Sequence, residues 1–519
     1  MTDQRTPAAG PSPDSAPNLS GSAPERRETD VVVIGGGAVG ENAADRVAQS
    51  GLAVVLVESA LIGGECSYWA CMPSKALLRP GTALKGAASV AGSRQAVTGT
   101  LDVQAVLERR NSFTSHWDDS KQEAWVRESG IGLLRGQALL TGPREVAVQL
   151  PDGGSVLLSA RHAVVLATGS EPTPPPLEGL ADVDYWGTRE ATSAQEIPQR
   201  LIVLGGGVAG TELAQAYARL GSSVTLVARS GLLGMYPGPA RELVEAGLAG
   251  DGVEVRTHTG TAFVRSDGSG GVVLGLDDGT TLSADRLLVA TGRAPALRGL
   301  GLEALGLAGA GRPRLKSDDT GLVHGTDWLY AVGDAAGKVM LTHQGKYEAR
   351  AAGAAIAARA AGGLPSGAGN DAAGTDAAGA DGIAADGAVP APWSRYTATA
   401  DHTAVPQVVF TDPEIAMVGR TLEQALEDGV KATETSLKIS VAGSALHSDG
   451  YDGWAQMVVD EDRGVLVGVT FAGPDVAELL HAATIAVAGE VPLDRLWHAV
   501  PAYPTISEVW LRLLEKYGL

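Results

Sequence analysis

The stretch DVVVIGGGAVG, residues 30–40, joins an apolar run to a glycine pattern. Its consecutive aliphatic residues are typical of a strand that is buried on both faces of a parallel sheet. A helical run from Glu41 to Gln49 follows, then a second strand from Ala53 to Val57 that ends in Glu58. This order is typical of a dinucleotide-binding unit, in which glycines let the backbone approach a pyrophosphate at a helix N-terminus and the acid accepts from a ribose hydroxyl. We therefore expect a dinucleotide to contact Gly35, Gly37, Gly40 and Glu58.

The same pattern recurs in the middle of the chain. Residues 201–204 form an apolar strand, GGGVAG follows at 205–210, a helix runs through Leu220 and a strand covers 223–227. Two such units predict two dinucleotides, one tightly held and one exchanging. Ala228 and Arg229 stand where the acid of the first unit stands. An acid suits the free ribose hydroxyl of NAD, whereas an arginine can pair with the phosphate of NADP. The pattern favours NADPH, and a solvated surface charge is the alternative interpretation of Arg229.

The only two cysteines of the chain, Cys66 and Cys71, lie five positions apart behind a Gly-Gly pair. In a regular helix this spacing would hold their Cα atoms roughly 8–9 Å apart, whereas a disulfide needs about 4.4–6.8 Å. They can bridge only if Cys66 precedes the helix or lies in a distorted first turn. The helix N-terminus would then lower a thiol pKa. Two unreactive buried cysteines or a structural disulfide are the alternatives, and no further cysteines exist to complete a zinc site. A redox-active dithiol is favoured.

Length and charge limit the remaining possibilities. A chain of 519 residues exceeds one core and suggests several domains. Its formal net charge of -20 argues against nucleic acid or an anionic membrane surface as a partner, and no apolar run has the length of a membrane span. A cycling dithiol belongs in a reducing compartment, so we expect the cytoplasm. Residues 1–29 have the composition of a disordered tail without a signal peptide, and residues 361–392 that of a flexible Gly/Ala/Asp-rich insertion.

The segment GGECSYWACMPSK, residues 63–75, resembles the active-site disulfide of the class I pyridine nucleotide-disulfide oxidoreductases, flavoenzymes that include dihydrolipoamide dehydrogenase, glutathione reductase and mercuric reductase. The resemblance extends from about Asp30 to the C-terminus, interrupted by one insertion. It implies an α/β fold with two Rossmann-like nucleotide-binding domains, the NAD(P) domain inserted in the FAD domain, and a C-terminal α+β interface domain. The expected boundaries are a tail at 1–29, an FAD domain at 30–175 and 296–360, an NAD(P) domain at 176–295, an insertion at 361–400 and a dimerisation domain at 401–519.

The resemblance also implies roles for individual residues. Cys71 would lie nearest the flavin and form the charge-transfer thiolate, while Cys66 exchanges with the acceptor. Lys75 would lie near flavin N5 and pair with Glu212. Contacts to FAD are implied, beyond the first glycine pattern, for Lys75, Ala138, Thr168, Gly169, Asp334 and Thr342. Contacts to NAD(P) are implied for Gly205, Gly207, Gly210, Arg229 and Gly292. The family's second phosphate-binding arginine would fall near Met235 and is missing.

The C-terminal segment departs from the family. There a histidine, donated across a homodimer, is the acid/base for the dithiol, and a glutamate follows its His-Pro-Thr segment. This sequence keeps Glu508 but has Tyr503 in place of the histidine. A tyrosine ordinarily titrates near 10 rather than about 6.5, so it is a poor base at neutral pH. His498 lies in the same segment as an alternative base, although a structural histidine is favoured. Mercuric reductases share the tyrosine, but their C-terminal cysteine pair is absent here.

Together these features predict an FAD-dependent NAD(P)H oxidoreductase. Electrons would pass from NAD(P)H through FAD and the dithiol to a disulfide-type or other small acceptor, in a homodimer without metal, nucleic acid or membrane. Two alternatives stay open. One is an NAD(P)H:quinone or metal-ion reductase that acts directly from the flavin, and the other is a redox-sensing flavoprotein with negligible turnover.

Overall fold

The computed structural model describes residues 24–308, 313–364 and 390–519. Within them the chain forms two compact units. The first combines residues up to 68 with 114–171 and 293–401, and the second combines 69–113, 172–292 and 402–519. Most of the expected tail and insertion lies outside the described residues. The expected domain boundaries placed 69–113 with the first nucleotide fold, whereas these residues group with the second because Leu77, Leu78 and Leu107 pack against Ala216 and Leu220.

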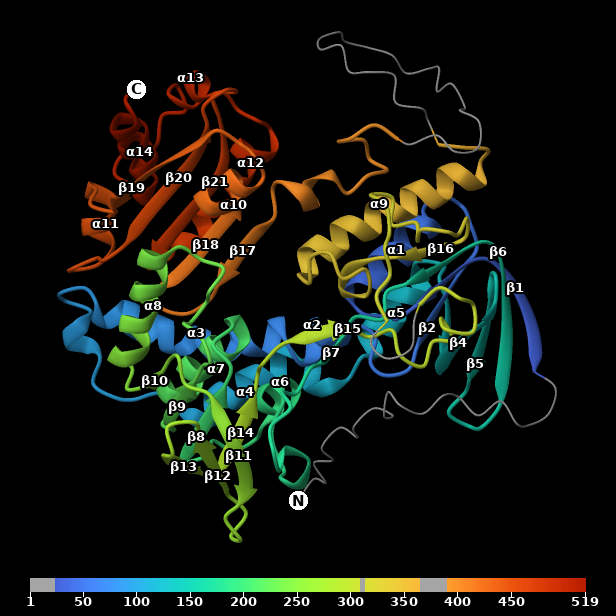
Figure 1. The fold of residues 1–519 in the computed structure, drawn as a ribbon, viewed down its shortest axis with the longest axis horizontal. Helices are drawn as coiled ribbons and strands as arrows, with labels where there is room; N and C mark the ends of the chain where they lie inside the picture. The colour runs from blue at the N-terminus through green and yellow to red at the C-terminus, as the bar shows by residue number, and fades with distance from the viewer. Residues whose placement is uncertain (1–23, 309–312, 365–389) are drawn as a thin grey trace. The chain divides into compact units, whose positions relative to one another are not determined.

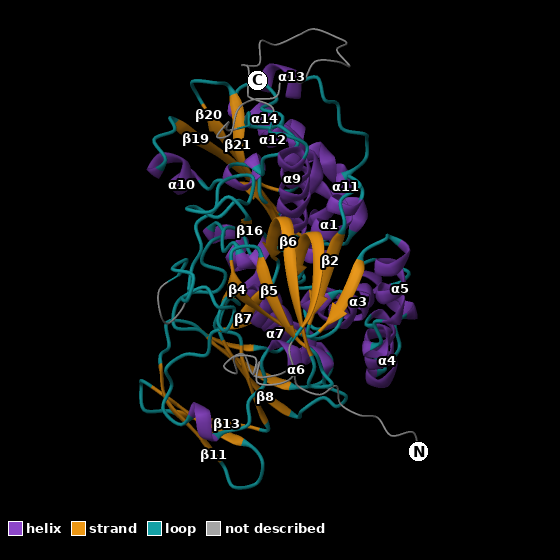
Figure 2. Ribbon diagram, turned by 90° about the vertical axis from the view of Figure 1, so that its right-hand side faces the viewer, coloured by secondary structure: helices purple, strands orange, loops and turns teal. Residues whose placement is uncertain are grey.

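The first unit is built on a seven-stranded sheet of order β3-β2-β1-β6-β5-β4, with β16 beside β6. Strands β1, β2, β3, β6 and β16 pair in parallel, and β4 and β5 add an antiparallel edge (Figure 2). The bounds are Glu25–Ile34 for β1, Val54–Glu58 for β2, Gly132–Arg135 for β3, Gln137–Gly142 for β4, Glu145–Gln149 for β5, Ser155–Leu166 for β6 and Leu329–Ala331 for β16.

The run that opens the chain's first nucleotide fold is buried on both faces of this sheet. Val31 and Val33 pack with residues of helices α1 (Ala38–Ala48) and α9 (Thr342–Ala360), which lie side by side (Figure 1). Val32 and Ile34 pack on the opposite face with apolar residues of β4, β5 and β6. Alternate residues of a strand point to opposite faces, so a continuous aliphatic run is what such a strand requires.

The expected N-terminal tail is wrong for its last residues. Glu25–Thr29 extend β1 and pair in parallel with Val156–Ala160 of β6. Backbone pairing with a long partner strand suffices to order these residues even though Glu25–Glu28 are exposed. Because the side chains of Glu25–Glu28 are charged and exposed, their composition does not indicate a strand.

The second unit contains a four-stranded parallel sheet of order β10-β9-β8-β14, whose strands are Glu254–Arg256, Ser223–Val227, Arg200–Leu204 and Arg286–Val289. Helix α7 (Val208–Arg219) follows β8 and α8 (Gly238–Gly250) precedes β10. An antiparallel meander of β11 (Thr261–Ser266), β12 (Val272–Leu276) and β13 (Thr281–Ala284) completes this fold. Helices α3 (Cys71–Ala88) and α4 (Val103–Phe113) belong to the same unit.

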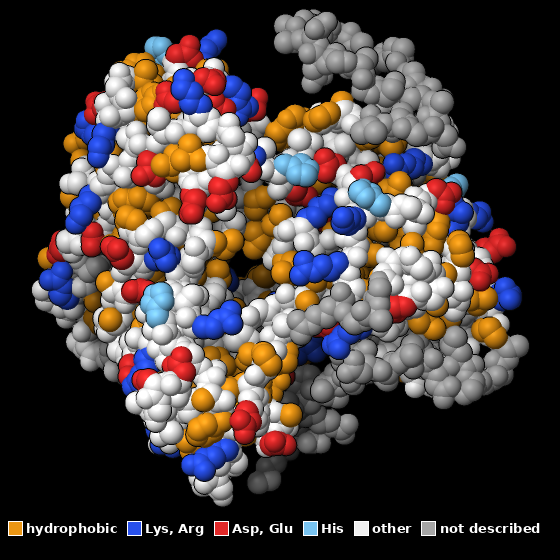
Figure 3. All heavy atoms as spheres, viewed as in Figure 1, with side chains coloured by type: hydrophobic (Ala, Val, Ile, Leu, Met, Phe, Trp, Pro, Cys, Tyr) orange, Lys and Arg blue, Asp and Glu red, His pale blue; other side chains and the backbone are white. Residues whose placement is uncertain are grey.

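The C-terminal part of the second unit is an antiparallel sheet of order β17-β18-β21-β20-β19. Its strands are Pro406–Val409, Glu414–Gly419, Val465–Gly473, Trp454–Asp460 and Ala432–Lys438, and helices α12 (Leu480–Ala488) and α14 (Val509–Tyr517) pack beside it. None of the helices in the described residues is both long and apolar enough to cross a membrane. On the face in Figure 3, acidic and basic side chains are interspersed rather than gathered into one patch.

Candidate functional site

The turn between β1 and α1 can be built only from glycines at two positions. Gly35 has φ +102°, and a Cβ there would lie 2.3 Å from the Ala167 carbonyl oxygen. A Cβ on Gly40 would lie 1.8 Å from the Gly35 carbonyl oxygen. Gly37 caps the N-terminus of α1, whose first N–H groups have no acceptor within the helix. The geometry of the turn is compatible with the anion site that the glycine pattern predicted, and this site stays a prediction.

Glu58 ends β2 beside this turn. The N–H of Gly36 donates to Glu58 Oε2 (2.6 Å) and the N–H of Ala60 donates to Oε1 (2.6 Å). Burial raises the pKa of the Glu58 carboxyl above its usual value, although both hydrogen bonds oppose the shift. Each carboxylate oxygen has a second acceptor site, so Glu58 can hold the turn and still accept from a ribose hydroxyl.

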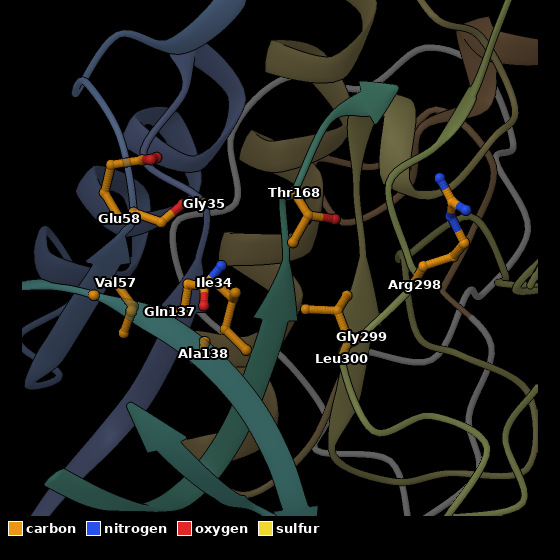
Figure 4. A pocket seen from close by; sticks show the side chains of 12 residues that line it. Ile34, Gly35, Val57, Glu58, Gln137, Ala138, Thr168, Arg298, Gly299 and Leu300 are labelled. Atoms are coloured by element: carbon orange, nitrogen blue, oxygen red, sulfur yellow. The ribbon is translucent and has the colours of Figure 1, made fainter. Parts of the chain in front are cut away.

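A cavity of about 180 Å³ opens between the ends of these strands. Figure 4 shows Glu58 and Gly35 on one side and Leu300 and Arg298 across from them, with Thr168 between. The Thr168 hydroxyl is buried and has no hydrogen-bond partner among the described residues. A glycine cradle, a helix N-terminus and an unsatisfied hydroxyl fit a dinucleotide. The remaining residues that line the cavity are Ile34, Val57, Ser59, Gly136, Gln137, Ala138 and Gly299.

The second turn of this unit brings Asp334 to Ser170. The Ser170 hydroxyl donates to Asp334 Oδ2 (2.5 Å) and accepts from Arg293 Nε (2.8 Å), while Arg293 Nη2 donates to the Ser170 carbonyl (2.7 Å). Gly169 precedes Ser170 with φ +75°. Thr342, the first residue of α9, places another helix N-terminus in the same unit. The family resemblance implies that Thr168, Gly169 and Asp334 contact one cofactor, which stays a prediction. It assigned no role to Arg293, whose hydrogen bonds to Ser170 order the turn.

Glu348 is a buried carboxyl that the sequence did not single out. It is 5% exposed, and its Oε2 accepts from the N–H of Gly333, next to Asp334 (2.6 Å). Burial, together with the charge of Asp401, raises the pKa of Glu348 to about 8, against the opposing effects of the Gly333 hydrogen bond and Lys338. A glutamate within the Ala-rich helix α9 carries no motif, so only the packing reveals it.

Glu348 makes stability depend on pH. Because its folded pKa is raised, the native state holds a proton that the unfolded state releases, and the free energy of unfolding falls as pH rises from about 4.5 toward 8. The slope for one full proton is about 1.4 kcal/mol per pH unit. We expect Glu348→Gln, which keeps an acceptor for Gly333 and cannot ionise, to gain thermal stability relative to wild type as pH rises from 5 to about 8. The exposed Glu128→Gln is the control, and equal pH profiles for the Glu348 variant and wild type would contradict the expectation.

The second nucleotide fold repeats the steric pattern of the first. Gly205 has φ +124°, with a Cβ position 2.4 Å from the Ala290 carbonyl oxygen, and a Cβ on Gly210 would lie 2.0 Å from the Gly205 carbonyl oxygen. A Cβ on Gly207, which caps α7, would meet no atom within 4 Å. Gly292, with φ +134°, follows β14. Gly205 and Gly210 allow the backbone segments of the turn to pack closely, whereas Gly207 lies at an open helix N-terminus that suits a pyrophosphate.

Two arginines flank the loop after β9. Ala228 is buried and Arg229 is exposed at the end of the strand. Arg241 of α8 reaches back to the loop, since a Cβ on Gly231 would lie 3.3 Å from its Nη1. The Nε of Arg241 is buried without a hydrogen-bond partner among the described residues. The family resemblance predicts a second arginine only near Met235, and Arg241 carries no motif in the sequence that would reveal it.

The two cysteines lie on two consecutive helices, a short one and a long one, rather than on one continuous helix. Cys66 belongs to α2 (Gly64–Tyr68) and Cys71 is the first residue of α3. Ala70 between them has φ -131° and ψ -96°, outside the helical region. Both cysteines are half-buried. The break provides the departure from regular helix that a dithiol with this spacing needs.

Lys75 lies four residues after Cys71 and forms an ion pair with Glu212 of α7. Its Nζ lies 2.7 Å from Glu212 Oε2, and Glu212 Oε1 accepts from the N–H of Phe410 (2.9 Å). The Lys75 ammonium also lies 4.8 Å from the centre of the Phe410 ring. The Glu212 side chain is 3% exposed and that of Lys75 35%. The buried Glu212 carboxylate fixes the partly exposed Lys75 ammonium in place. It can thereby orient a positive charge toward a ligand.

Of the three C-terminal candidates, Tyr503 and His498 lie at the surface of the chain. Tyr503 is 77% exposed, and His498 is exposed as well. Glu508 Oε1 accepts from Arg512 Nη2 (2.6 Å), and its Oε2 is buried with no hydrogen-bond partner among the described residues. The described part of the chain holds no group of three or more His, Cys, Asp or Glu side chains arranged to bind a metal ion.

Comparison with known proteins gives one consistent result. The family described as pyridine nucleotide-disulphide oxidoreductase matches residues 29–349, and its dimerisation domain matches 405–513. Over 484 residues the chain is 33% identical to a mercuric reductase of Shigella flexneri, covering 92% of this chain and 79% of that protein. It is 31% identical over 502 residues to a dihydrolipoyl dehydrogenase of Thermus scotoductus, covering 94% and 96%.

Solved structures agree on the fold. The copper complex of the HOCl-induced flavoprotein disulfide reductase RclA from Escherichia coli superposes with a TM-score of 0.76 over 94% of this chain and 99% of that one. The sequence identity is 21%, so this likeness concerns the fold alone. The two nucleotide folds and the C-terminal sheet have counterparts in an established architecture.

Proposed function

Since the chain belongs to the pyridine nucleotide-disulphide oxidoreductase family, whose members bind FAD and a pyridine nucleotide, we propose that it carries electrons from NAD(P)H through FAD and a Cys66–Cys71 dithiol to a small acceptor. The observation that carries the proposal is the Lys75–Glu212 ion pair of 2.7 Å. It ties α3, which begins at Cys71, to α7, the helix of the second nucleotide fold. A residue of the helix that begins at Cys71 is thereby fixed to the fold that is proposed to bind the nicotinamide nucleotide.

The roles of the chain's own residues follow from this arrangement. Bound FAD supplies the ability to accept a hydride and release two electrons. Glu212 orients the Lys75 ammonium, and the ammonium stabilises negative charge that develops on the ligand beside it. The reduced pair then gives two electrons and two protons to the acceptor and returns to a disulfide. Cys66 is the exchanging thiol, and Cys71 is the thiol assigned to the cofactor side.

The C-terminal dimerisation domain is proposed to complete the site of a second copy. Tyr503 and Glu508 lie in this domain, and the high exposure of Tyr503 leaves its phenol accessible to a partner subunit. Tyr503 would donate a hydrogen bond to the acceptor, with Glu508 holding the segment through Arg512.

A panel of acceptors tests the proposal. Purified protein is mixed with NADPH in a stopped-flow instrument, and lipoamide, low-molecular-weight disulfides, quinones and mercuric ion are compared as acceptors in steady state. Steady NADPH oxidation with at least one acceptor is expected and rejects a sensor without turnover. Loss of the activity when both cysteines are replaced supports the dithiol route, and undiminished activity would refute it.

A second candidate is direct reduction of a quinone or metal ion by the flavin. It is favoured by Tyr503, which replaces the family's acid/base histidine. Activity that survives loss of both cysteines would select this candidate.

NADPH is the proposed pyridine nucleotide. Arg229 and Arg241 flank the loop where a nucleotide 2′-phosphate would lie, and one charge-assisted pair is worth about 1.5–3 kcal/mol. We expect kcat/KM for NADPH to exceed that for NADH by about tenfold or more. Arg229→Glu should reverse the preference and Arg241→Met should weaken it, while Arg265→Glu, an exposed residue of β11, should leave it unchanged. Equal kcat/KM values in the wild type would contradict the assignment.

A further inference from the structure

The carbonyl of Trp69 lies between the two cysteines and cannot accept the i→i+4 hydrogen bond of a regular helix. In a continuous α-helix it would accept from the N–H four residues later, and residue 73 is a proline without an N–H. Trp69 is only 6% exposed, so water is a poor substitute. A buried carbonyl of this kind requires a partner from elsewhere in the fold.

Thr192 supplies that partner. It lies on α6 (Thr188–Ser193), is 1% exposed, and its hydroxyl donates to the Trp69 carbonyl at 2.8 Å. From the same helix the guanidinium of Arg189 lies 4.1 Å from the centre of the Trp69 ring, a cation–π contact. Helix α6 therefore contacts both the backbone and the side chain of the residue at the helix break.

Helix α6 is itself anchored by a fully buried arginine. Arg110 of α4 is 0% exposed, and its two terminal nitrogens donate to the carbonyls of Thr192 and Ala194, the latter at 2.7 Å. The planar guanidinium fixes two acceptors with little loss of freedom. The Tyr217 hydroxyl of α7 donates to the Ala191 carbonyl (2.6 Å). The Thr192 hydroxyl is thus held in place from two further helices.

We propose that Thr192 is a positioning residue for the dithiol, which holds the Trp69 carbonyl out of helical register and so stabilises the disulfide form of the Cys66–Cys71 pair. This inference rests on the proposed function. The physical reason is the spacing of the two cysteines, because a regular helix would separate them beyond bonding distance, and a bond that maintains the break favours the state that needs it. Removing the hydroxyl should therefore make the disulfide easier to reduce.

The test is the reduction equilibrium of the full-length FAD-loaded protein. Wild type and Thr192→Val are equilibrated in mixtures of reduced and oxidised dithiothreitol, whose two thiols give two electrons and two protons to the protein disulfide and close to a ring disulfide. Alkylation and mass spectrometry then give the fraction of dithiol. We expect the dithiol-to-disulfide ratio of Thr192→Val to rise about tenfold in a given buffer, which is about 30 mV for a two-electron couple.

Two variants serve as controls. Thr192→Ser keeps the hydroxyl and should retain the wild-type ratio. Ser193→Ala removes a hydroxyl from the same helix that donates to the Arg189 carbonyl (2.8 Å) rather than to Trp69, and should also leave the ratio unchanged. Bound flavin and thermal unfolding verify that each variant is folded. A wild-type ratio in folded Thr192→Val, or an equal shift in Ser193→Ala, overturns the inference. An oxidised wild type without a Cys66–Cys71 disulfide overturns the proposed function itself.

Discussion

Replacing Cys71 with serine is expected to abolish the long-wavelength absorbance that appears when NADPH reduces the protein, and to reduce turnover of disulfide acceptors on the order of 10³-fold or more. The absorbance arises when a thiolate lies against an oxidised flavin, and Cys71 is the residue assigned to that position. Serine keeps the size of the side chain but offers no thiolate at neutral pH. Reductive titration in an anaerobic cuvette measures the band, and steady-state NADPH oxidation measures turnover.

The companion variants make the result specific. Cys66→Ser leaves Cys71 without a disulfide partner and should show the band already in the resting protein, while losing disulfide-acceptor turnover to a similar extent. Ser67→Ala, between the cysteines, should behave as wild type. If both cysteine variants keep the wild-type spectrum on reduction, the two thiols do not serve the flavin and the dithiol assignment fails.

Restoring the family's histidine, in Tyr503→His, is expected to raise dihydrolipoamide oxidation at least about tenfold, within the 10²–10⁴-fold that general acid–base help contributes. Exchange with a dithiol needs a group that accepts a proton as one thiolate forms and returns it as the product leaves. A phenol accepts a proton poorly at neutral pH, whereas an imidazole does so readily. Because Tyr503 is 77% exposed, the substitution should not disturb the core. We therefore expect the wild-type protein to oxidise dihydrolipoamide weakly and to reduce quinones faster.

Quinone reduction provides the internal reference, since it needs no such base and should change little in Tyr503→His. Tyr503→Phe removes the phenol, which contributes a hydrogen bond but little basicity, and should change the weak dihydrolipoamide rate far less than Tyr503→His does. A wild type that oxidises dihydrolipoamide as fast as it reduces quinones would contradict this assignment of Tyr503. His498→Ala would then identify or exclude the other histidine of the segment.

The sequence by itself determined the two nucleotide folds, because the information that specifies them is local. Four aliphatic residues in a row are typical of a strand that is buried on both faces. At Gly35 and Gly40 any side chain would collide with a backbone carbonyl oxygen of another residue, so the pattern admits only glycine there. The same sterics at Gly205 and Gly210 identify the second fold. The aliphatic run, the spacing of the glycines and the length of the following helical run can all be recognised within one stretch of the sequence. The family resemblance of residues 63–75 rests on the same kind of local pattern.

Tertiary structure alone decided the features that depend on partners distant in the chain. Glu25–Thr29 resemble a tail until β6 provides a strand to pair with. Burial of α9 against the Gly333 turn raises the pKa of Glu348 to about 8.

At Trp69, between the two cysteines, sequence and tertiary structure each determine one part of the conformation. Pro73 has no N–H, so the Trp69 carbonyl cannot accept the hydrogen bond that a regular helix would give it from four residues later. Only the fold shows that Thr192, more than a hundred positions away and held by Arg110, provides a donor instead. A residue's local conformation depends largely on its neighbours in sequence. Its distant hydrogen-bond partners and its pKa depend on how the chain packs around it, because packing decides which groups are buried together.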